Sequence, residues 1–170
     1  MKIGFIGAGR VGSAAAYTIL LLLNPDELAL VDIAEDLAKG EALDLTHAAH
    51  ALGKSVEIAG GSDYKLLEGS DLIIVSAGAA RKPGMSRLDL LQKNAGIMKS
   101  VAEKLKPVLE DAPIMVVTNP VDLTTYILWR NLEIPRSRIM GMGGVLDTAR
   151  LRSLQRGEGG GIVLGEHGDG

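Results

Sequence analysis

The chain has 170 residues, of which 46% are hydrophobic and 23% charged, and a formal net charge of −3. This composition indicates one globular domain with a substantial core, and the scattered Lys and Arg exclude the basic stripe of a nucleic-acid-binding surface. The absence of cysteine excludes disulfides and thiolate metal sites, and the lack of a bilayer-length apolar run or a leader pattern favours a cytoplasmic protein with no membrane partner.

The first residues combine a short apolar run with a glycine pattern. The run Ile3–Ile6 predicts a strand, and G-x-G-x-x-G follows it at Gly7, Gly9 and Gly12, before a helix over 13–23. In this context the pattern is typical of a turn that holds a dinucleotide diphosphate. The first glycine permits the tight turn, the second lets the phosphates approach the backbone, and the third lets the helix pack on the strand. Free N–H groups at the helix N-terminus then point at the phosphates.

The second predicted strand, over 27–32, ends in a carboxylate. Asp32 lies twenty residues after Gly12, which is the interval at which a dinucleotide-binding fold has the acid that binds the adenosine ribose hydroxyls. A negative charge there also repels a 2′-phosphate, so the sequence favours NAD over NADP. The alternative is that Asp32 only ends the strand as a turn residue.

The rest of the chain alternates between predicted helices and strands. In chain order the elements are a helix over 35–50, a strand at 56–58, a turn at 60–63, a helical turn at 64–67, a strand at 72–76, a loop with three cations at 77–87, a helix over 88–109 with Leu91, Ile97, Val101 and Leu105 buried, a strand at 114–118, a helix over 123–129, a strand at 138–141, a helix over 146–154, a glycine-rich breaker at 157–161 and a strand at 162–164. Such alternation predicts an α/β fold with a doubly wound parallel sheet.

Parallel sheets carry their sites at the carboxyl ends of the strands. The polar residues expected at that edge are Arg81, Arg87, Arg150, Asn119, Asp147 and His167. The planar fork of arginine binds both oxygens of a carboxylate, and a histidine with an aspartate can move a proton. The pattern therefore indicates an anionic substrate and a proton-transfer step.

Several motifs stand in order along the chain. They are Gly-Ala-Gly-Arg-Val-Gly at 7–12, Asp32, Ala-Arg-Lys-Pro-Gly-Met-Ser-Arg at 80–87, Val-Thr-Asn-Pro at 117–120, Leu-Asp-Thr-Ala-Arg at 146–150 and Gly-Glu-His-Gly-Asp at 165–169. Together they resemble the lactate/malate dehydrogenase family, most closely the lactate-dehydrogenase-like malate dehydrogenases of prokaryotes. The likeness covers the chain to about Gln155 and resumes at Ile162. It implies a Rossmann fold, NAD as the cofactor, and a single NAD-binding domain over 1–170.

The resemblance also implies roles for the residues on the substrate side. His167 would be the general acid/base that protonates the substrate carbonyl oxygen as hydride arrives from the nicotinamide, and Asp147 would hold the other imidazole nitrogen. Arg87 would polarise the carbonyl, and Arg150 would bind the C1 carboxylate. Arg81 would pair with a second carboxylate, which favours malate and oxaloacetate over lactate and pyruvate.

By the same resemblance, Asn119 would bind both the nicotinamide ribose and the substrate, and its bond to Pro120 would be cis. The 79–90 loop would close as a lid over the substrate. The cofactor contacts would come from the glycine turn and the ends of the following strands, at Gly7, Gly9, Arg10, Val11, Gly12, Asp32, Ile33, Ala77, Gly78 and Asn119.

Four of the charged residues on the substrate side also have an ordinary structural interpretation. His167 could be an exposed loop residue, and Arg81 and Arg87 could be solvated loop cations. Asp147 could cap the helix that follows it, a role that is compatible with catalysis.

A metal site is not expected. His47 and His50 lie three residues apart on a predicted helix with Asp44 nearby, but a helical histidine pair without a third convergent ligand is usually structural.

The chain departs from the family pattern in its last third. Family members continue for well over a hundred residues as a substrate domain, the 150–165 segment is shorter here, and Gly157–Gly161 resembles a replacement linker. We therefore interpret the chain as a truncated or engineered NAD-binding domain without its substrate domain. Three hypotheses follow: a weak NAD-dependent malate dehydrogenase, an NAD-binding module without turnover, or a scaffold that self-associates, with the 35–50 helix as the contact surface.

Overall fold

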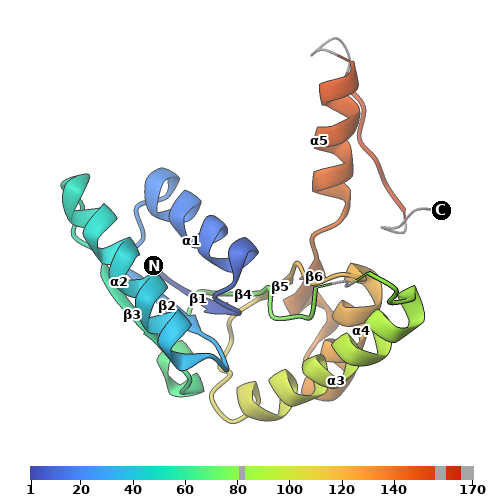
Figure 1. Ribbon diagram of the computed structural model, residues 1–170, viewed down its shortest axis with the longest axis horizontal. Helices are drawn as coiled ribbons and strands as arrows, with labels where there is room; N and C mark the ends of the chain where they lie inside the picture. The colour runs from blue at the N-terminus through green and yellow to red at the C-terminus, as the bar shows by residue number, and fades with distance from the viewer. Residues whose placement is uncertain (81–82, 156–159, 166–170) are drawn as a thin grey trace.

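The computed structural model of the chain describes residues 1–80, 83–155 and 160–165. Its centre is a parallel sheet of six strands in the order β3-β2-β1-β4-β5-β6 (Figure 1). The strands are β1 Lys2–Ile6, β2 Glu27–Val31, β3 Glu57–Gly61, β4 Leu72–Val75, β5 Ile114–Val116 and β6 Ile139–Gly141. The order reverses between β1 and β4, which confirms the predicted doubly wound fold.

Helices cover both faces of the sheet (Figure 1). They are α1 Arg10–Leu22, α2 Glu35–Ala51, α3 Arg87–Leu105, α4 Val121–Leu132 and α5 Gly144–Leu154, with 3₁₀ turns η1 Tyr64–Leu67 and η2 Arg136–Arg138. The first pair, α1 and α2, packs on one face and the second pair, α3 and α4, on the other. Right-handed crossovers in both directions from β1 produce this arrangement.

The core consists of two layers because alternate strand residues point to opposite faces. On β2, Leu28 and Leu30 belong to the layer under α1 and α2. Ala29 and Val31 belong to the layer under α3 and α4. All four are at most 1% exposed, as expected for a parallel strand with both faces covered.

The predicted turn at 60–63 is wrong in its first half, because β3 continues through Gly60 to Gly61. A Cβ atom on Gly60 would lie 2.1 Å from the carbonyl oxygen of Ala38, on α2. The glycine therefore lets α2 approach the sheet closely, and it serves packing where the sequence indicated a chain reversal.

Several helix boundaries also differ from the prediction: α1 begins at Arg10, three residues early, and α5 at Gly144, two residues early. Helix α3 ends at Leu105, four residues early, since Pro107 has no N–H with which to continue it. Val101 and Leu105 are buried as expected, but Leu91 and Ile97 are only half-buried. Helix α4 starts at Val121, directly after the proline, and runs to Leu132.

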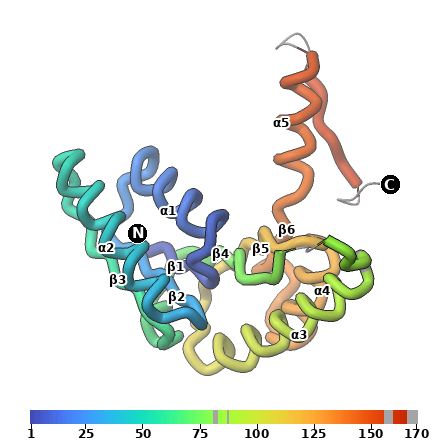
Figure 2. Tube along the Cα trace, viewed as in Figure 1, coloured from blue at the N-terminus to red at the C-terminus, as the bar shows by residue number. Residues whose placement is uncertain are grey.

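The predicted strand at 162–164 is absent: this described segment has no strand conformation. It runs back beside α5, which stands away from the sheet (Figures 1 and 2), and the Val163 N–H donates to Thr148 Oγ1 at 3.0 Å. Ile162 and Leu164 are 69% and 87% exposed. The segment therefore forms a backbone bond to a side chain of α5, its Ile162 and Leu164 side chains face solvent, and it adds no strand to the sheet. Among the described residues, no helix combines the length and apolarity needed to cross a membrane.

The close approach at Gly60 gives a first prediction. Gly60→Ala places a methyl group against the α2 backbone, and we expect the free energy of unfolding to fall by about 1–3 kcal/mol. Gly40→Ala, in α2, is the control because no atom lies within 4 Å of its added Cβ. That variant should be neutral or stabilising by up to about 1 kcal/mol. Urea unfolding followed by circular dichroism measures both; equal effects would contradict the packing role of Gly60.

Candidate functional site

The three glycines of the opening motif have three different surroundings. Gly7 has a φ of +105°, and a Cβ there would lie 2.5 Å from the backbone nitrogen of Ala77. A Cβ on Gly12 would lie 1.9 Å from the Gly7 carbonyl oxygen, so α1 packs directly on the turn. A Cβ on Gly9 would have no atom within 4 Å. The turn is therefore closed on its inner side and open at Gly9.

The N-terminus of α1 begins at this open position. Its N-cap residue is Gly9, no side chain caps the helix, and the first turn has no acidic residue. The backbone N–H groups there carry the positive end of the helix dipole. Together with the open space at Gly9, they form a cradle that fits a diphosphate.

Asp32 lies at the end of β2 beside this cradle. One carboxylate oxygen accepts from the Ala8 N–H at 2.8 Å, and the other accepts from the Ala34 N–H at 2.9 Å. The second bond is the turn contact that the alternative interpretation of Asp32 expected, whereas the first ties the glycine turn to β2. Nearby, burial and then the negative charge of Asp32 raise the pKa of Tyr64 to about 12.

A buried asparagine joins the loops that follow β4 and β5. Asn94, on α3, is 1% exposed; its Oδ1 accepts from the Ala79 N–H at 2.8 Å, and its Nδ2 donates to the Asn119 carbonyl at 2.7 Å. Asn94 belongs to none of the sequence motifs and was not predicted as a site residue. Its signal is a polar side chain on the stripe of α3 that also carries Met98 and Leu105, both fully buried.

Two threonines complete the junction between these loops. Thr118 Oγ1 donates to the Ala77 carbonyl at 2.8 Å, and Thr124 Oγ1 donates to the Thr118 carbonyl at 2.6 Å. The Asn119–Pro120 bond is cis, as the resemblance implied. A Cβ on Gly78 would lie 2.5 Å from Thr118 Cγ2, so the two loops are in close contact.

The first turns of α5 bring a carboxylate and a guanidinium together. Asp147 Oδ1 accepts from Arg150 Nη1 at 3.0 Å, one turn apart on the helix. The N-cap of α5 is Gly143, so the interpretation of Asp147 as the helix cap is wrong. Asp147 lies in the first turn, where its negative charge interacts favourably with the positive end of the helix dipole.

Some predicted site residues are beyond what the structure describes. Arg81 and His167 lie outside the described residues. Arg87 is the first residue of α3, fixed by a capping box: Ser86 Oγ accepts from the Asp89 N–H at 3.1 Å, and Asp89 Oδ2 accepts from the Ser86 N–H at 3.0 Å. In the described part of the chain, no three His, Asp or Glu side chains lie close enough together to hold a metal. This includes Asp44, His47 and His50.

The sheet order, the open glycine turn and the acid at the end of β2 define a Rossmann dinucleotide-binding domain. Residues 1–141 match the family model described as lactate/malate dehydrogenase, NAD binding domain, and the chain belongs to this family.

Similar proteins agree with this assignment. A malate dehydrogenase of Archaeoglobus fulgidus is 54% identical, over 99% of this chain and 59% of its own length. An L-lactate dehydrogenase of Kosmotoga olearia is 44% identical, over 99% of this chain and 54% of its own length. The solved structure of the A. fulgidus malate dehydrogenase in complex with NADH has a TM-score of 0.96, with 54% identity over 99% of this chain and 59% of that chain. The chain thus spans little more than half the length of these relatives. The family model and the NADH complex identify its cofactor as NAD.

Asn94 gives the second prediction. Asn94→Ala leaves the Ala79 N–H and the Asn119 carbonyl without their partner in a part-buried setting, and it also empties the space of a buried side chain. An unsatisfied buried group costs about 1–3 kcal/mol, and truncating a buried side chain adds to this loss. We expect the free energy of unfolding to fall by about 2–4 kcal/mol in urea titrations. Asn131→Ala is the matched control, because that exposed side chain bonds only the Ile127 carbonyl of its own helix. A loss of similar size in the control would contradict the bridging role.

Proposed function

We propose that this chain binds NAD(H) along the carboxyl edge of its sheet and transfers hydride between the cofactor and malate or oxaloacetate. The observation that carries the proposal is the convergence at one edge. The ends of β1, β2, β5 and β6 there lead into the glycine turn, Asp32, Asn119 and the Asp147–Arg150 pair. Crevices at this edge are where doubly wound sheets bind their ligands.

The cofactor half of the proposal rests on the cradle. The N–H groups at the start of α1 bind the diphosphate, and Asp32 binds the adenosine ribose hydroxyls with the lone pairs that its two backbone bonds leave free. Exposed Val11 and Ile33 flank the adenosine, at 56% and 89% exposure in the free chain. The diphosphate is held by Gly7, Gly9, Arg10, Val11 and Gly12, and the nicotinamide riboside by Ala77, Gly78 and Asn119.

The chemical half assigns a role to each charged residue near the substrate. NADH supplies the hydride to the substrate carbonyl carbon, and His167 supplies the proton to the carbonyl oxygen, so oxaloacetate becomes malate. Asp147 orients the imidazole and stabilises its protonated form. Arg87 stabilises the negative charge that develops on the carbonyl oxygen.

The substrate carboxylates pair with the other two arginines. Arg150 holds the C1 carboxylate; its guanidinium has five N–H donors, so it can keep its bond to Asp147 while it binds the substrate. Arg81 pairs with the second carboxylate, which selects the dicarboxylates. The dicarboxylate preference rests on Arg81 alone, since the other groups suit any 2-hydroxy acid.

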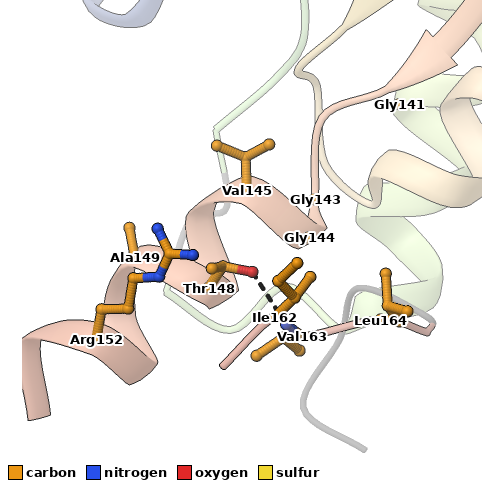
Figure 3. A pocket seen from close by; sticks show the side chains of 10 residues that line it. All are labelled: Gly141, Gly143, Gly144, Val145, Thr148, Ala149, Arg152, Ile162, Val163 and Leu164. Carbon is orange, nitrogen blue, oxygen red and sulfur yellow. Dashed lines mark hydrogen bonds between the residues drawn. The ribbon is translucent and has the colours of Figure 1, made fainter. Parts of the chain in front are cut away.

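A specific observation favours NAD binding without turnover as the second candidate. An open hollow of about 740 Å³ lies between α5 and residues 162–164, lined with apolar side chains such as Val145 and Leu164 (Figure 3). These two side chains are 70% and 87% exposed. Water therefore reaches the start of α5, which weakens the electrostatic stabilisation on which hydride transfer depends. Self-association through α2, where Leu43 is 55% exposed, is the third candidate.

An oxaloacetate assay separates these candidates. The absorbance of NADH at 340 nm should fall steadily when oxaloacetate is added to the chain, with a smaller response to pyruvate. His167→Ala should reduce the rate by at least about a hundredfold, since proton transfer of this kind contributes about 10²–10⁴. NADH binding by fluorescence without turnover would support the second candidate. No NADH binding together with a large species in light scattering would leave only the third.

Gly9 separates cofactor binding from fold stability. Gly9 has φ −71° and ψ −173°, which alanine adopts without strain, and beyond its chain neighbours no described residue has an atom within 4 Å of the added methyl group. Gly9→Ala should therefore keep the melting temperature while its methyl group displaces the diphosphate, with affinity for NADH at least about tenfold lower. Gly96→Ala, on α3 and also in open space, should leave affinity unchanged. Equal affinity for NADH in the two variants would argue against a diphosphate at Gly9.

A further inference from the structure

One peptide group in the glycine turn is held at both ends by side chains. The carbonyl oxygen of Gly7 accepts from Ser76 Oγ at 2.9 Å, and the N–H of the same peptide group, which belongs to Ala8, donates to Asp32 Oδ2 at 2.8 Å. Ser76 directly follows β4 and Asp32 directly follows β2, and these strands flank β1 on its two sides. The Gly7–Ala8 peptide is therefore clamped between the two neighbours of β1.

The clamp directs the Gly7 carbonyl beneath α1. Gly12 is buried, and a Cβ on it would lie 1.9 Å from the Gly7 oxygen and 2.8 Å from Ser76 Oγ, so carbonyl, hydroxyl and helix meet at one point. The main chain of Ser76 is itself fixed, because its N–H donates to the Ile6 carbonyl at 2.9 Å. The hydroxyl thus holds the carbonyl from a rigid strand end.

We propose that Ser76 is a positioning residue for the diphosphate of the cofactor. Gly7 has φ +105° and no side chain, so its peptide group can rotate about the backbone at low cost. Rotation would turn the Gly7 carbonyl oxygen toward the edge where Asp32 and the proposed diphosphate lie, and it would break the bond from the Ala8 N–H to Asp32. The Ser76 hydroxyl prevents that rotation, and it does so without touching the ligand.

This inference rests on the proposed cofactor site and adds a residue to it. The predicted cofactor contacts include the neighbours Ala77 and Gly78 but not Ser76. The ordinary alternative is that Ser76 only fills space at the end of β4.

Ser70 provides the matched control. It lies two residues before β4, is 8% exposed, and its Oγ has no hydrogen-bond partner among the described residues. Ser70→Ala and Ser76→Ala therefore remove the same atom from the two ends of one strand, and only the second removes a bond to the glycine turn.

The experiment compares Ser76→Ala, Ser76→Thr and Ser70→Ala with the parent chain. Affinities for NADH and for ADP are measured by calorimetry, and the exchange rate of the Ala8 amide proton is measured by NMR without ligand. Ser76→Ala should lower both affinities about tenfold, in line with the loss of one hydrogen bond. It should also speed exchange at Ala8. Ser76→Thr keeps the hydroxyl and should restore both properties, while Ser70→Ala should change neither.

The outcomes separate the positioning role from the cofactor site. If the parent chain binds NADH and ADP and Ser76→Ala binds them equally well, only the positioning role is overturned, even where the melting temperature falls. If the parent chain binds neither ligand, the cofactor site is overturned and the positioning role with it. Ser76→Cys, a similar side chain with a weak donor, is the second variant should Ser76→Ala not fold; affinities equal to those of the parent chain would overturn the role.

Discussion

The structure depends on the close crossing of α1 over the end of β1. At that crossing the Cα of Gly12 packs against the Gly7 carbonyl so closely that a single methyl group would lie 1.9 Å from the oxygen. A helix this near to its strand aims its N-terminal N–H groups at the space beyond the sheet edge. The same contact closes the turn on its inner side, whereas at Gly9 the turn is open. Helix packing and the proposed diphosphate cradle therefore depend on the same few backbone atoms at Gly7 and Gly12.

The edges of this turn are held by strands that are distant in sequence. Asp32 fixes it from β2 and Ser76 from β4, and both bonds go to the backbone of the turn. The second half of the sheet repeats the arrangement with Asn94, which fixes the backbone after β4 and after β5. In each half, buried or half-buried polar side chains bind backbone groups at the strand ends, where an unpaired group would be costly. These polar side chains therefore lie at the strand ends, beside the proposed cofactor site.

Much of this could be predicted from the sequence, because the informative signals are local. Alternating apolar runs and helical patterns were enough for the doubly wound sheet, and the glycine spacing with Asp32 was enough for the cradle. The predictions are wrong where contacts with distant segments determine the local conformation. Gly60 suggested a turn because the approach of α2 is not visible in its neighbours, and 162–164 suggested a strand because an apolar triplet does not reveal its partner. Asn94 was missed since its two bonds go to loops 15 and 25 residues away. The roles of all the predicted site residues stay predictions, those of Arg81 and His167 included.

The two sides of the proposed site differ in how firmly they are built. On the cofactor side, the turn is held by the sheet and by side chains from two strands. On the substrate side, Asp147 and Arg150 lie on α5, a helix that stands away from the sheet, and Arg150 is 63% exposed in its pair with Asp147 (Figure 1). A solvated ion pair of this kind contributes little to orientation, so the geometry of these two residues depends on what covers α5. We therefore expect cofactor affinity to be a property of the sheet itself, and substrate turnover to vary with the enclosure of the hollow between α5 and residues 162–164.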